Sequence, residues 1–381
     1  MLTADGCRRR RERLWETIGD ECDLVVISDP VHLTYFTNFS TSIFEFRSND
    51  ATAAAVLARD RATLIADNLL QPFLDRSFVD EAIAPVWYEG KRSAGSRRAQ
   101  LAATVLEFVL DAASARRIGI EYGAAPVGLT EGLRHRKSGL ELVDLDPVIA
   151  PLRRSKDPDE VEVTRRAIRA GDAGFARAME VVRPGMTEQE AFRLIQEAVI
   201  ARAGEPVRVY GDFVSGRRTE AVGGPASERT IARGDLFLLD MSAVIHGYRG
   251  DAANTFCVGA PPTPWQLERF NACLDAIAAG EAMLRPGSRC RAIDEAVRAA
   301  LGEHARLSTH RSHTGHGLGL SHPEAPFIVR ESEETLRRGD VVTLEPGLYI
   351  AGEGGMRFER NYLITEDGFE TLSGHELRIE V

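Results

Sequence analysis

The sequence feature that most limits the possible folds is a hairpin pattern that carries acids inside strand-like runs. Residues 236–259 read LFLLDMSAVIHGYRGDAANTFCVG, in which two such runs flank a turn at His246 and Gly247. Asp240 and Asp251 stand almost equidistant from this turn, so a hairpin would place them across from each other. Asp240 follows the apolar run LFLL, where an unpaired charge costs free energy.

The same pattern returns in residues 341–365, which read VVTLEPGLYIAGEGGMRFERNYLIT. Glu345 and Glu359 are symmetric about Gly352 in a Gly-rich turn region. Like charges opposite each other on neighbouring strands destabilise a sheet, and four converging carboxylates without a counter-charge would cost still more. Each acid alone is more often a solvated surface residue than a ligand. The joint pattern instead favours a bound cation.

A histidine stands between the two predicted hairpins. The segment 311–326 reads RSHTGHGLGLSHPEAP and contains His316 among glycines, which we expect to let backbone and metal approach closely. One nitrogen and several carboxylate oxygens suit Mn, Co, Zn or Fe(II), and the oxygens are enough to bridge two ions. A dinucleotide loop would need a strand before these glycines and a helix after them, and both are lacking.

The first part of the chain, residues 1–150, predicts an α/β layer domain because strand and helix patterns alternate in it. We expect strands at Asp23–Ile27, Ala53–Leu57, Ala62–Ile65 and Arg117–Ile120 and a helix at Gln100–Ala113. This part contains neither a Gly-rich phosphate loop nor a cluster of histidines or carboxylates, so we expect no chemistry in it.

The second part, residues 151–381, begins with a helix start at Asp157-Pro158-Asp159-Glu160. Within it, the tripeptide Arg-Pro-Gly precedes an amphipathic helix pattern twice, at residues 187–203 and at residues 291–304. Strand-rich sequence follows each helix. The arrangement indicates a duplicated helix-plus-sheet unit, although chance can also produce two such openings.

Composition limits the possible partners and compartments. The 57 acidic residues outnumber the 47 basic ones, and the net charge of -10 repels phosphate backbones. We interpret the run Arg8–Arg11 as the solvated face of an N-terminal helix. The chain shows no long apolar stretch, no signal-peptide pattern and no CxxC pairing among its five cysteines. We expect a cytoplasmic protein with neither a nucleic acid nor a membrane as partner.

The motifs LLDMSAVIHGYRGDAANTF, GHGLGLSHPEAP, TLEPGLYI and GMRFERNYLIT resemble, in order and spacing, those of the pita-bread metallopeptidases and their relatives. This group includes prolidase, aminopeptidase P, methionine aminopeptidase and creatinase. Residues 1–150 are similar to the creatinase-type N-terminal domain, and residues 151–381 resemble the α+β pita-bread catalytic domain with its internal pseudo-twofold. The resemblance also implies a homodimer.

The resemblance implies a set of site residues. Its metal ligands fall on Asp240, Asp251, His316, Glu345 and Glu359. It further implies a water or hydroxide that two divalent metal ions acidify for attack on a scissile carbonyl. Glu345 would be the general base, and Arg357 would steady Glu359.

Two departures from the family pattern concern histidines that, by the resemblance, position the substrate and stabilise the oxyanion. Where the family reads P-H-x-x-P-S-D-R, this chain reads VGGPASER, with Gly223 in place of the histidine. Seven residues after His316 the chain has Pro323, and His322 stands one position earlier. We expect His322 or His313 to take over this catalytic work, against the alternative that both are structural or exposed loop histidines.

These departures leave several functions open. The leading hypothesis is a metal-dependent hydrolase of a C–N bond, an Xaa-Pro dipeptidase or aminopeptidase P type of enzyme that acts on a small peptide. The alternative is a creatinase-like hydrolase, or a lyase, of a small non-peptide molecule on the same fold, which the missing histidine favours. A non-catalytic binding protein is a third reading, but such relatives have lost metal ligands and this chain has lost none.

Overall fold

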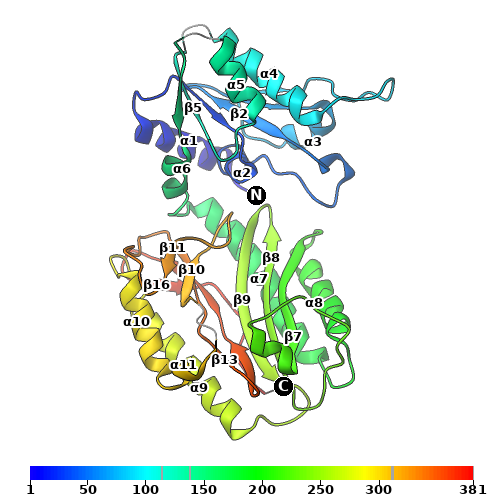
Figure 1. Ribbon diagram of the computed structural model, residues 1–381, viewed down its shortest axis with the longest axis vertical. Coiled ribbons are helices and arrows are strands. Elements are labelled where there is room, and N and C mark those ends of the chain that lie inside the picture. The colour runs from blue at the N-terminus through cyan, green and yellow to red at the C-terminus, as the bar shows by residue number, and fades with distance from the viewer. Residues whose placement is uncertain (113–114, 137–138, 310–312, 381) are drawn as a thin grey trace. The chain divides into compact units, whose positions relative to one another are not determined.

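The structure is a computed structural model that describes residues 1–112, 115–136, 139–309 and 313–380. The chain divides into two compact units, Met1–Arg153 and Arg154–Val381; Figure 1 traces the elements of both units. The boundary expected from the sequence lay after residue 150. Among the described residues, every helix is too short or too polar to cross a lipid bilayer.

The first unit is built on a six-stranded mixed sheet with the order β4-β3-β2-β1-β5-β6. Its strands are β1 (Leu24–Ile27), β2 (Ala53–Leu57), β3 (Ala62–Ala66), β4 (Glu81–Ile83), β5 (Arg117–Ile120) and β6 (Glu141–Asp144). Its helices are α1 (Ala4–Ile18), α2 (Pro30–Thr37), α3 (Gln71–Leu74), α4 (Arg97–Asp111), α5 (Val127–Arg136) and α6 (Asp146–Leu152). The predicted α/β class is confirmed.

The four predicted strands agree with β1, β2, β3 and β5 to within one residue at each end. β1, β2 and β3 are buried along their whole length, because strands covered on both faces can be apolar at every position. The predicted helix corresponds to α4, which begins at Arg97, where the Ser96 side chain caps it. The predicted last residue, Ala113, lies outside the described residues.

The interpretation of the run Arg8–Arg11 as a solvated face is wrong for Arg10 and in part for Arg11, which is half-buried and donates hydrogen bonds to the carbonyls of Phe36 and Phe78. Arg8 and Arg9 are exposed and pair with Asp5, as expected. Arg10 is fully buried in α1, and its Nε donates a hydrogen bond of 2.7 Å to the carbonyl of Tyr35. A helix turns 100° per residue, so four consecutive arginines cannot all face solvent when one side of the helix packs on the domain.

The second unit contains three sheets, with the strand orders β7-β8-β9, β11-β10-β12-β15-β16 and β13-β14. Its strands are β7 (Arg208–Ser215), β8 (Leu236–Ile245), β9 (Tyr248–Cys257), β10 (Gly315–Gly317), β11 (Glu324–Ile328), β12 (Val341–Leu344), β13 (Gly347–Ile350), β14 (Gly354–Arg357), β15 (Arg360–Ile364) and β16 (Phe369–Thr371). Its helices are α7 (Pro158–Val181), α8 (Glu188–Ala203), α9 (Pro264–Glu281), α10 (Cys290–Leu301) and α11 (His304–Leu307).

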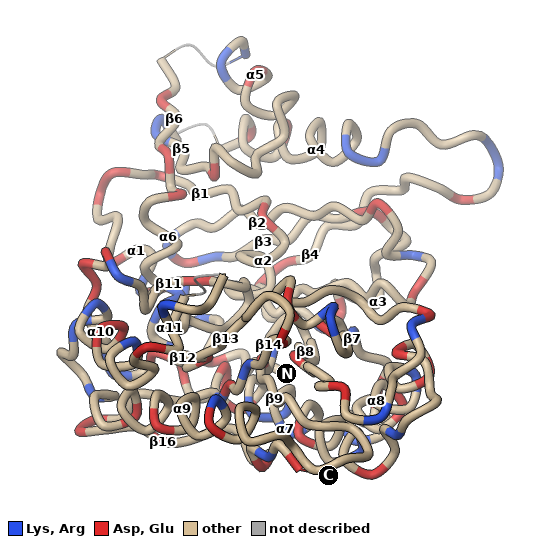
Figure 2. Tube along the Cα trace, turned by 60° about the horizontal axis from the view of Figure 1, so that its bottom comes forward, with Lys and Arg blue, Asp and Glu red and all other residues tan. Residues whose placement is uncertain are grey.

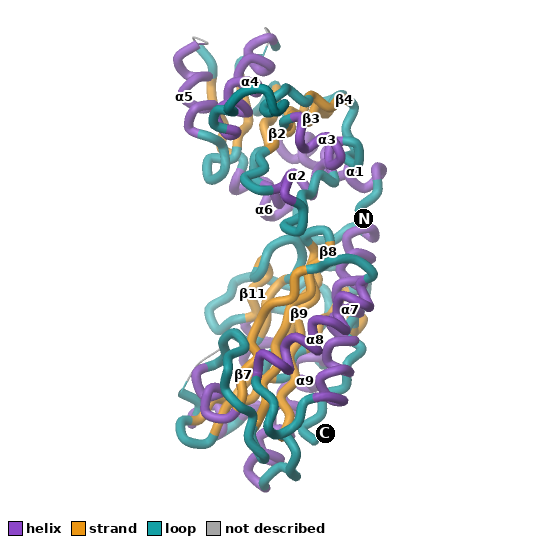
Figure 3. Tube along the Cα trace, turned by 90° about the vertical axis from the view of Figure 1, so that its right-hand side faces the viewer, coloured by secondary structure: helices purple, strands orange, loops and turns teal. Residues whose placement is uncertain are grey.

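The four long helices of this unit form two pairs that cover its strands. α7 packs on α8 and along β8 and β9, as Figure 3 shows, and α9 packs on α10 at the opposite side of the strands (Figure 1). α7 begins at the predicted point, with a capping box between Asp157 and Glu160 and a proline in its first turn. Acidic and basic residues are interspersed along α8, α9 and α10 (Figure 2).

The two Arg-Pro-Gly openings occupy equivalent turns. Gly185 and Gly287 both have left-handed backbones, with φ of 92° and 86°, which favour glycine. Their N–H groups donate hydrogen bonds of 2.9 and 2.8 Å to the carbonyls of Ile231 and Leu336. These matched contacts support the predicted internal duplication, and the helices and separate sheets of this unit give the α+β arrangement predicted for it.

Candidate metal centre

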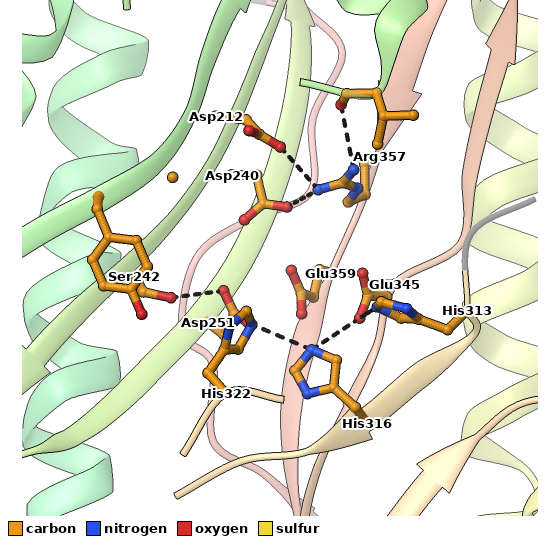
Figure 4. A pocket seen from close by; sticks show the side chains of 13 residues that line it. Asp212, Asp240, Ser242, Asp251, His313, His316, His322, Glu345, Arg357 and Glu359 are labelled. Carbon is orange, nitrogen blue, oxygen red and sulfur yellow. Dashed lines mark hydrogen bonds and ion pairs between the residues drawn. The ribbon is translucent and has the colours of Figure 1, made fainter. Parts of the chain in front are cut away.

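A pocket of about 420 Å³ in the second unit gathers acids, imidazoles and one guanidinium (Figure 4). Its lining residues are Tyr210, Gly211, Asp212, Val222, Asp240, Ser242, Asp251, His313, His316, His322, Glu345, Arg357 and Glu359. All five predicted metal ligands and both histidines predicted to be catalytic therefore lie in one place, although they come from segments far apart in the sequence.

Asp240 and Asp251 reach the pocket from the predicted hairpin of β8 and β9, but they are not directly opposite. β8 and β9 pair Asp240 with Ala253 and Asp251 with Ser242, so the two aspartates are diagonal neighbours on one face. The register is centred between residues 246 and 247, one residue beyond the midpoint of the two aspartates. The predicted direct pairing is therefore wrong. Ser242 instead donates a hydrogen bond of 3.0 Å from its hydroxyl to Asp251.

Glu345 and Glu359 hold the opposed positions that the sequence predicts. β12 pairs with β15 as far as Leu344 and Arg360, and β13 pairs with β14 in the same register, so the two glutamates are opposite each other at the junction. The backbone N–H of Glu359 also donates a hydrogen bond of 2.9 Å to the carbonyl of Ala253 on β9. This bridge brings the second pair of acids beside the first.

His316, on β10, points its Nε2 atom at the acids. Nε2 lies 3.2 Å from Oε1 of Glu345 and 3.6 Å from Oδ2 of Asp251. The other ring nitrogen, Nδ1, lies 2.9 Å from the carbonyl of Gly317, so in the neutral imidazole the proton is on Nδ1 and the lone pair is on Nε2. Burial lowers the pKa of His316, but the neighbouring carboxylates outweigh it and raise the pKa to about 9 in the metal-free protein.

The glycines around His316 let the backbones of neighbouring strands approach closely, as expected. A Cβ atom at Gly315 would lie 2.0 Å from the carbonyl oxygen of Thr343, and one at Gly317 would lie 2.2 Å from that of Ala325. Any side chain at either position would therefore collide with a neighbouring strand. The glycines let β10 fit between β11 and β12, and this fit positions the imidazole.

The acids of the cluster are buried without enough hydrogen-bond donors. Glu359 is 1% exposed, and its Oε1 atom has no hydrogen-bond partner among the described residues. Burial and the charges of Asp251, Glu345 and Asp240 raise the pKa of Glu359 well above its ordinary value. Burial likewise raises the pKa of Asp240 to about 7, although Arg357 opposes the shift. Buried carboxylates in this state fit a bound cation, which would supply the missing positive charge.

The described residues offer three overlapping groups of possible metal ligands. Within each group, the ligand atoms lie within 4.8 Å of one another. The groups are Asp240, Asp251 and Glu359; Asp251, His316 and His322; and His313, His316 and Glu345. Nε2 of His322 lies 2.6 Å from Oδ2 of Asp251, and Nε2 of His313 lies 2.9 Å from Oε1 of Glu345. The first two groups share Asp251, the last two share His316, and each additional histidine adjoins one predicted ligand.

The resemblance implied that Arg357 steadies Glu359, but in the described part of the chain its hydrogen bonds and ion pairs go to other residues. Its NH1 group pairs closely with Asp240 and lies 3.3 Å from Oδ2 of Asp212, and its Nε donates a hydrogen bond of 2.7 Å to the hydroxyl of Tyr349. Arg357 lowers the pKa of Glu359 only through its charge, as the smallest of the named influences. The guanidinium therefore lies beside Asp240 and Asp212 and offsets their negative charge.

Sequence reasoning missed Asp212, the acid that adjoins this guanidinium. β7 pairs Asp212 directly with Asp240, which would be unfavourable if Arg357 did not lie between them. Burial raises the pKa of Asp212 and Arg357 opposes the shift. A single acid in the run RVYGDFVS carries no signal of its own, and only the strand register reveals its place.

Comparisons with known proteins agree with this architecture. A model of metallopeptidase family M24 matches residues 162–366, and one of the creatinase/prolidase N-terminal domain matches residues 10–155. An Xaa-Pro dipeptidase of Pyrococcus furiosus is 30% identical over 259 residues, which cover 68% of this chain and 74% of that protein. An uncharacterized peptidase of Bacillus subtilis is 28% identical over 352 residues and covers 92% of this chain and 93% of its own.

Solved structures are similar over nearly the whole chain. An Xaa-Pro dipeptidase from Bacillus anthracis has a TM-score of 0.80 at 25% identity and covers all of both chains. A prolidase from Pyrococcus furiosus has a TM-score of 0.75 at 26% identity over 95% of this chain and 99% of its own. The matches confirm the predicted metallopeptidase type. The chain belongs to metallopeptidase family M24 and carries the creatinase/prolidase N-terminal domain.

Proposed function

We propose that this chain hydrolyses the amide C–N bond before proline in dipeptides or short peptides, with two divalent metal ions. The observation that carries the proposal is the buried carboxylate cluster, in which an oxygen of Glu359 has no donor in the part of the chain that the structure describes. The pocket of about 420 Å³ has room for a small peptide. The Pyrococcus furiosus and Bacillus anthracis relatives are named Xaa-Pro dipeptidases, which supports hydrolysis of the same bond here.

The ligand set suits two ions that share carboxylates. Asp240, Asp251 and Glu359 would hold one ion, and Asp251, His316, Glu345 and Glu359 would hold the other. One imidazole and four carboxylates form a mixed nitrogen and oxygen set, which suits Mn, Co, Zn or Fe. When bound, the ions supply Lewis acidity, which lowers the pKa of water and polarises the substrate carbonyl.

The chain's own residues provide the proton path. Hydrogen bonds from His313 and His316 outweigh burial and hold the pKa of Glu345 below its ordinary value, so this carboxylate is ionised and can accept a proton. Nε2 of His313 lies 2.9 Å from Oε1 of Glu345, so a neutral His313 with the lone pair on Nε2 would be close enough to receive that proton and pass it to the leaving amine. Glu345 is thus the proposed base and His313 the proposed shuttle.

His322 has a different position. Its Nε2 atom lies 2.6 Å from Asp251, and its side chain is 30% exposed at the pocket mouth. From there it can hydrogen-bond a developing oxyanion when protonated, or complete the coordination of an ion when neutral. Metal analysis of His322→Ala distinguishes the two roles. The variant should lose metal if His322 is a ligand and should keep it if His322 only stabilises the oxyanion.

The alternative substrate class is a small non-peptide amide. Gly223 leaves the pocket without a side chain at that point, and Asp212 adds a carboxylate to the wall. A screen of metal-loaded protein against Xaa-Pro dipeptides, longer Xaa-Pro peptides and small amidino or betaine compounds tests both candidates. Hydrolysis of Xaa-Pro substrates is the expected result; turnover of the small compounds alone would overturn the proposal.

Two further predictions accompany the function. The five cysteines are free and buried, which supports a reducing, cytoplasmic compartment. The homodimer stays a prediction, and light scattering at micromolar concentration tests it. A monomeric mass would contradict it.

A further inference from the structure

Asp212 occupies the space in which a side chain at position 223 would lie. A Cβ atom built on Gly223 would lie 2.0 Å from both Cγ and Oδ2 of Asp212. Gly223 is not among the glycines with a left-handed backbone, so its φ alone would accept other residues. The steric conflict is with the carboxylate, and a side chain at 223 and the present position of Asp212 exclude each other.

The carboxylate of Asp212 is held in place and still faces the pocket. Oδ1 accepts a hydrogen bond of 2.8 Å from the N–H of Gly224, and Oδ2 accepts one of 3.3 Å from Arg357. The side chain is 26% exposed and lines the pocket on the Asp240 side, away from His313 (Figure 4). A carboxylate has about four acceptor positions, so these two contacts leave room for a ligand donor.

The charges of the pocket indicate which ligand that donor belongs to. Five carboxylates and one guanidinium line the pocket, so with two divalent ions their formal charges cancel. Without Asp212 the same pocket would carry one net positive charge, which attracts a carboxylate. With Asp212 it loses that attraction and presents an anion that favours a cationic group.

We propose that Asp212 is a specificity-determining residue that accepts a hydrogen bond from a positively charged nitrogen of the substrate, an ammonium or guanidinium group near the scissile bond. This inference rests on the proposed function for its turnover assay. Removal of the side chain at position 223 makes room for this acceptor, so Gly223 and Asp212 act as a pair.

The primary test compares wild type with Asp212→Asn, using full-length, metal-loaded enzyme. Lys-Pro, Met-Pro and Glu-Pro vary the charge before the scissile bond, and Ala-Pro and Ala-prolinamide vary it after. We expect wild type to prefer Lys-Pro over Met-Pro in kcat/KM by about 10-fold or more, and Asp212→Asn to lose this preference. Glu366→Gln removes the same charge at an exposed site outside the pocket and should keep it. Equal preferences in wild type and Asp212→Asn would overturn the proposal.

A binding assay separates this inference from the proposed function. If metal-loaded wild type cleaves no Xaa-Pro substrate, the proposed function fails, and titration calorimetry with L-lysinamide and L-norleucinamide decides on Asp212. We expect lysinamide to bind wild type about 10-fold more tightly than norleucinamide, and Asp212→Asn to bind both equally. Equal binding of the two compounds to wild type would overturn the proposed role of Asp212.

A pair of alanine substitutions tests the steric premise. Gly223→Ala should lower the Tm of wild type by several degrees, because the new Cβ atom displaces Asp212. In the Asp212→Ala background Cγ is gone, so Gly223→Ala should cost little there. The same loss of Tm in both backgrounds would show that Asp212 does not occupy this space and would overturn the pairing. The double variant Asp212→Ala, Gly223→His should shift the preference from Lys-Pro toward Glu-Pro.

Discussion

Each unit buries a glutamate, but the two glutamates have different surroundings. In the first unit Glu121 is fully buried, and it accepts hydrogen bonds from the N–H groups of Ser28 and Asp29 and from the imidazole of His32. In the second unit Glu359 is equally buried, but one of its oxygens has no donor within the described residues of that unit. Burial of an acid is therefore no mark of a metal site. The mark is a buried acid among other acids with too few donors.

A second buried acid sharpens the contrast within the metal-binding unit itself. Glu188 at the start of α8 accepts hydrogen bonds of 2.7 Å from the N–H of Ser215 and 3.0 Å from that of Ser227, and it pairs with Arg218. Its role is to hold the loop that leads to Gly223, and it needs no ion. Buried acids with their own donors, such as Glu121, are therefore suitable controls for the acids of the cluster.

The largest effect is expected for Glu345→Gln. An amide cannot accept the proton of the attacking water, so kcat should fall by about 10²–10⁴ or more. Glu121→Gln is the matched control and should leave the kcat of folded enzyme unchanged. Steady-state kinetics on an Xaa-Pro dipeptide measures both variants, and an active Glu345→Gln would remove this residue from the role of base.

The next effect concerns the two histidines that adjoin the ligands. If either one stabilises the oxyanion or shuttles the proton, its replacement by alanine should lower Xaa-Pro turnover by about 10²–10³. His313→Ala should also shift the pH profile, because Glu345 loses a partner at 2.9 Å. His322→Ala separates catalysis from coordination through the metal content measured beside the rate. Unchanged turnover in both variants would contradict the hypothesis that His313 or His322 takes over the catalytic work.

The stability of the metal-free protein should depend on pH through the unsatisfied acids. Burial raises the pKa of Asp240 from 3.8 to about 7, so the folded state binds this proton more tightly than the unfolded chain. The resulting stability is present at acid pH and is lost as the pH rises from about 4 through about 7. His316, whose pKa rises from 6.5 to about 9 despite burial, extends the loss to higher pH.

Urea unfolding in chelator from about pH 5 to about pH 8 measures this loss. Glu345 contributes in the opposite direction, because its pKa is lowered from 4.5 in the folded protein. The stability it provides is lost only as the pH falls below about 4.5, outside this range. Bound metal should flatten the curve, since the ions keep the carboxylates ionised. A metal-free protein whose stability rises across this range would contradict the charge state assigned to Asp240.

The smallest effect is expected in the first unit. Arg153 donates a hydrogen bond of 2.8 Å to Nε2 of His32, which leaves Nδ1 as the donor toward Glu121. In Glu121→Gln the new NH₂ group would face that donor or give up an acceptor, so we expect a loss of about 1–3 kcal/mol in unfolding free energy. Denaturant titration measures the loss, and a fully stable variant would contradict the described network.

The sequence was enough to predict the parts that local chemistry determines. Four strands of the first unit follow from short apolar runs bounded by turn residues, and the hairpin of β8 and β9 follows from its turn. The opposed positions of Glu345 and Glu359 follow from symmetry about Gly352. In each case residues close in the chain specify the geometry.

Contacts between distant segments escaped prediction. The one-residue shift between Asp240 and Asp251 depends on where the turn is centred. Counting residues from each aspartate to the turn does not reveal that centre. Arg357 contacts Asp240 and Asp212 because β14 lies beside β8. The residues around Arg357 in the chain do not indicate that β14 packs there. The exclusion between Asp212 and Gly223 appears only when the loop folds back onto β7. Roles of individual site residues remain predictions for the experiments above.

The most direct test of the central claim is the metal content of purified, metal-loaded protein after desalting, measured by elemental analysis. We predict about two ions per chain for wild type and for Glu121→Gln, and a clear loss of ions for Asp251→Ala and His316→Ala. The control removes a buried carboxylate that has its own donors, whereas the test variants remove members of the cluster. Full metal content in both Asp251→Ala and His316→Ala would contradict the account.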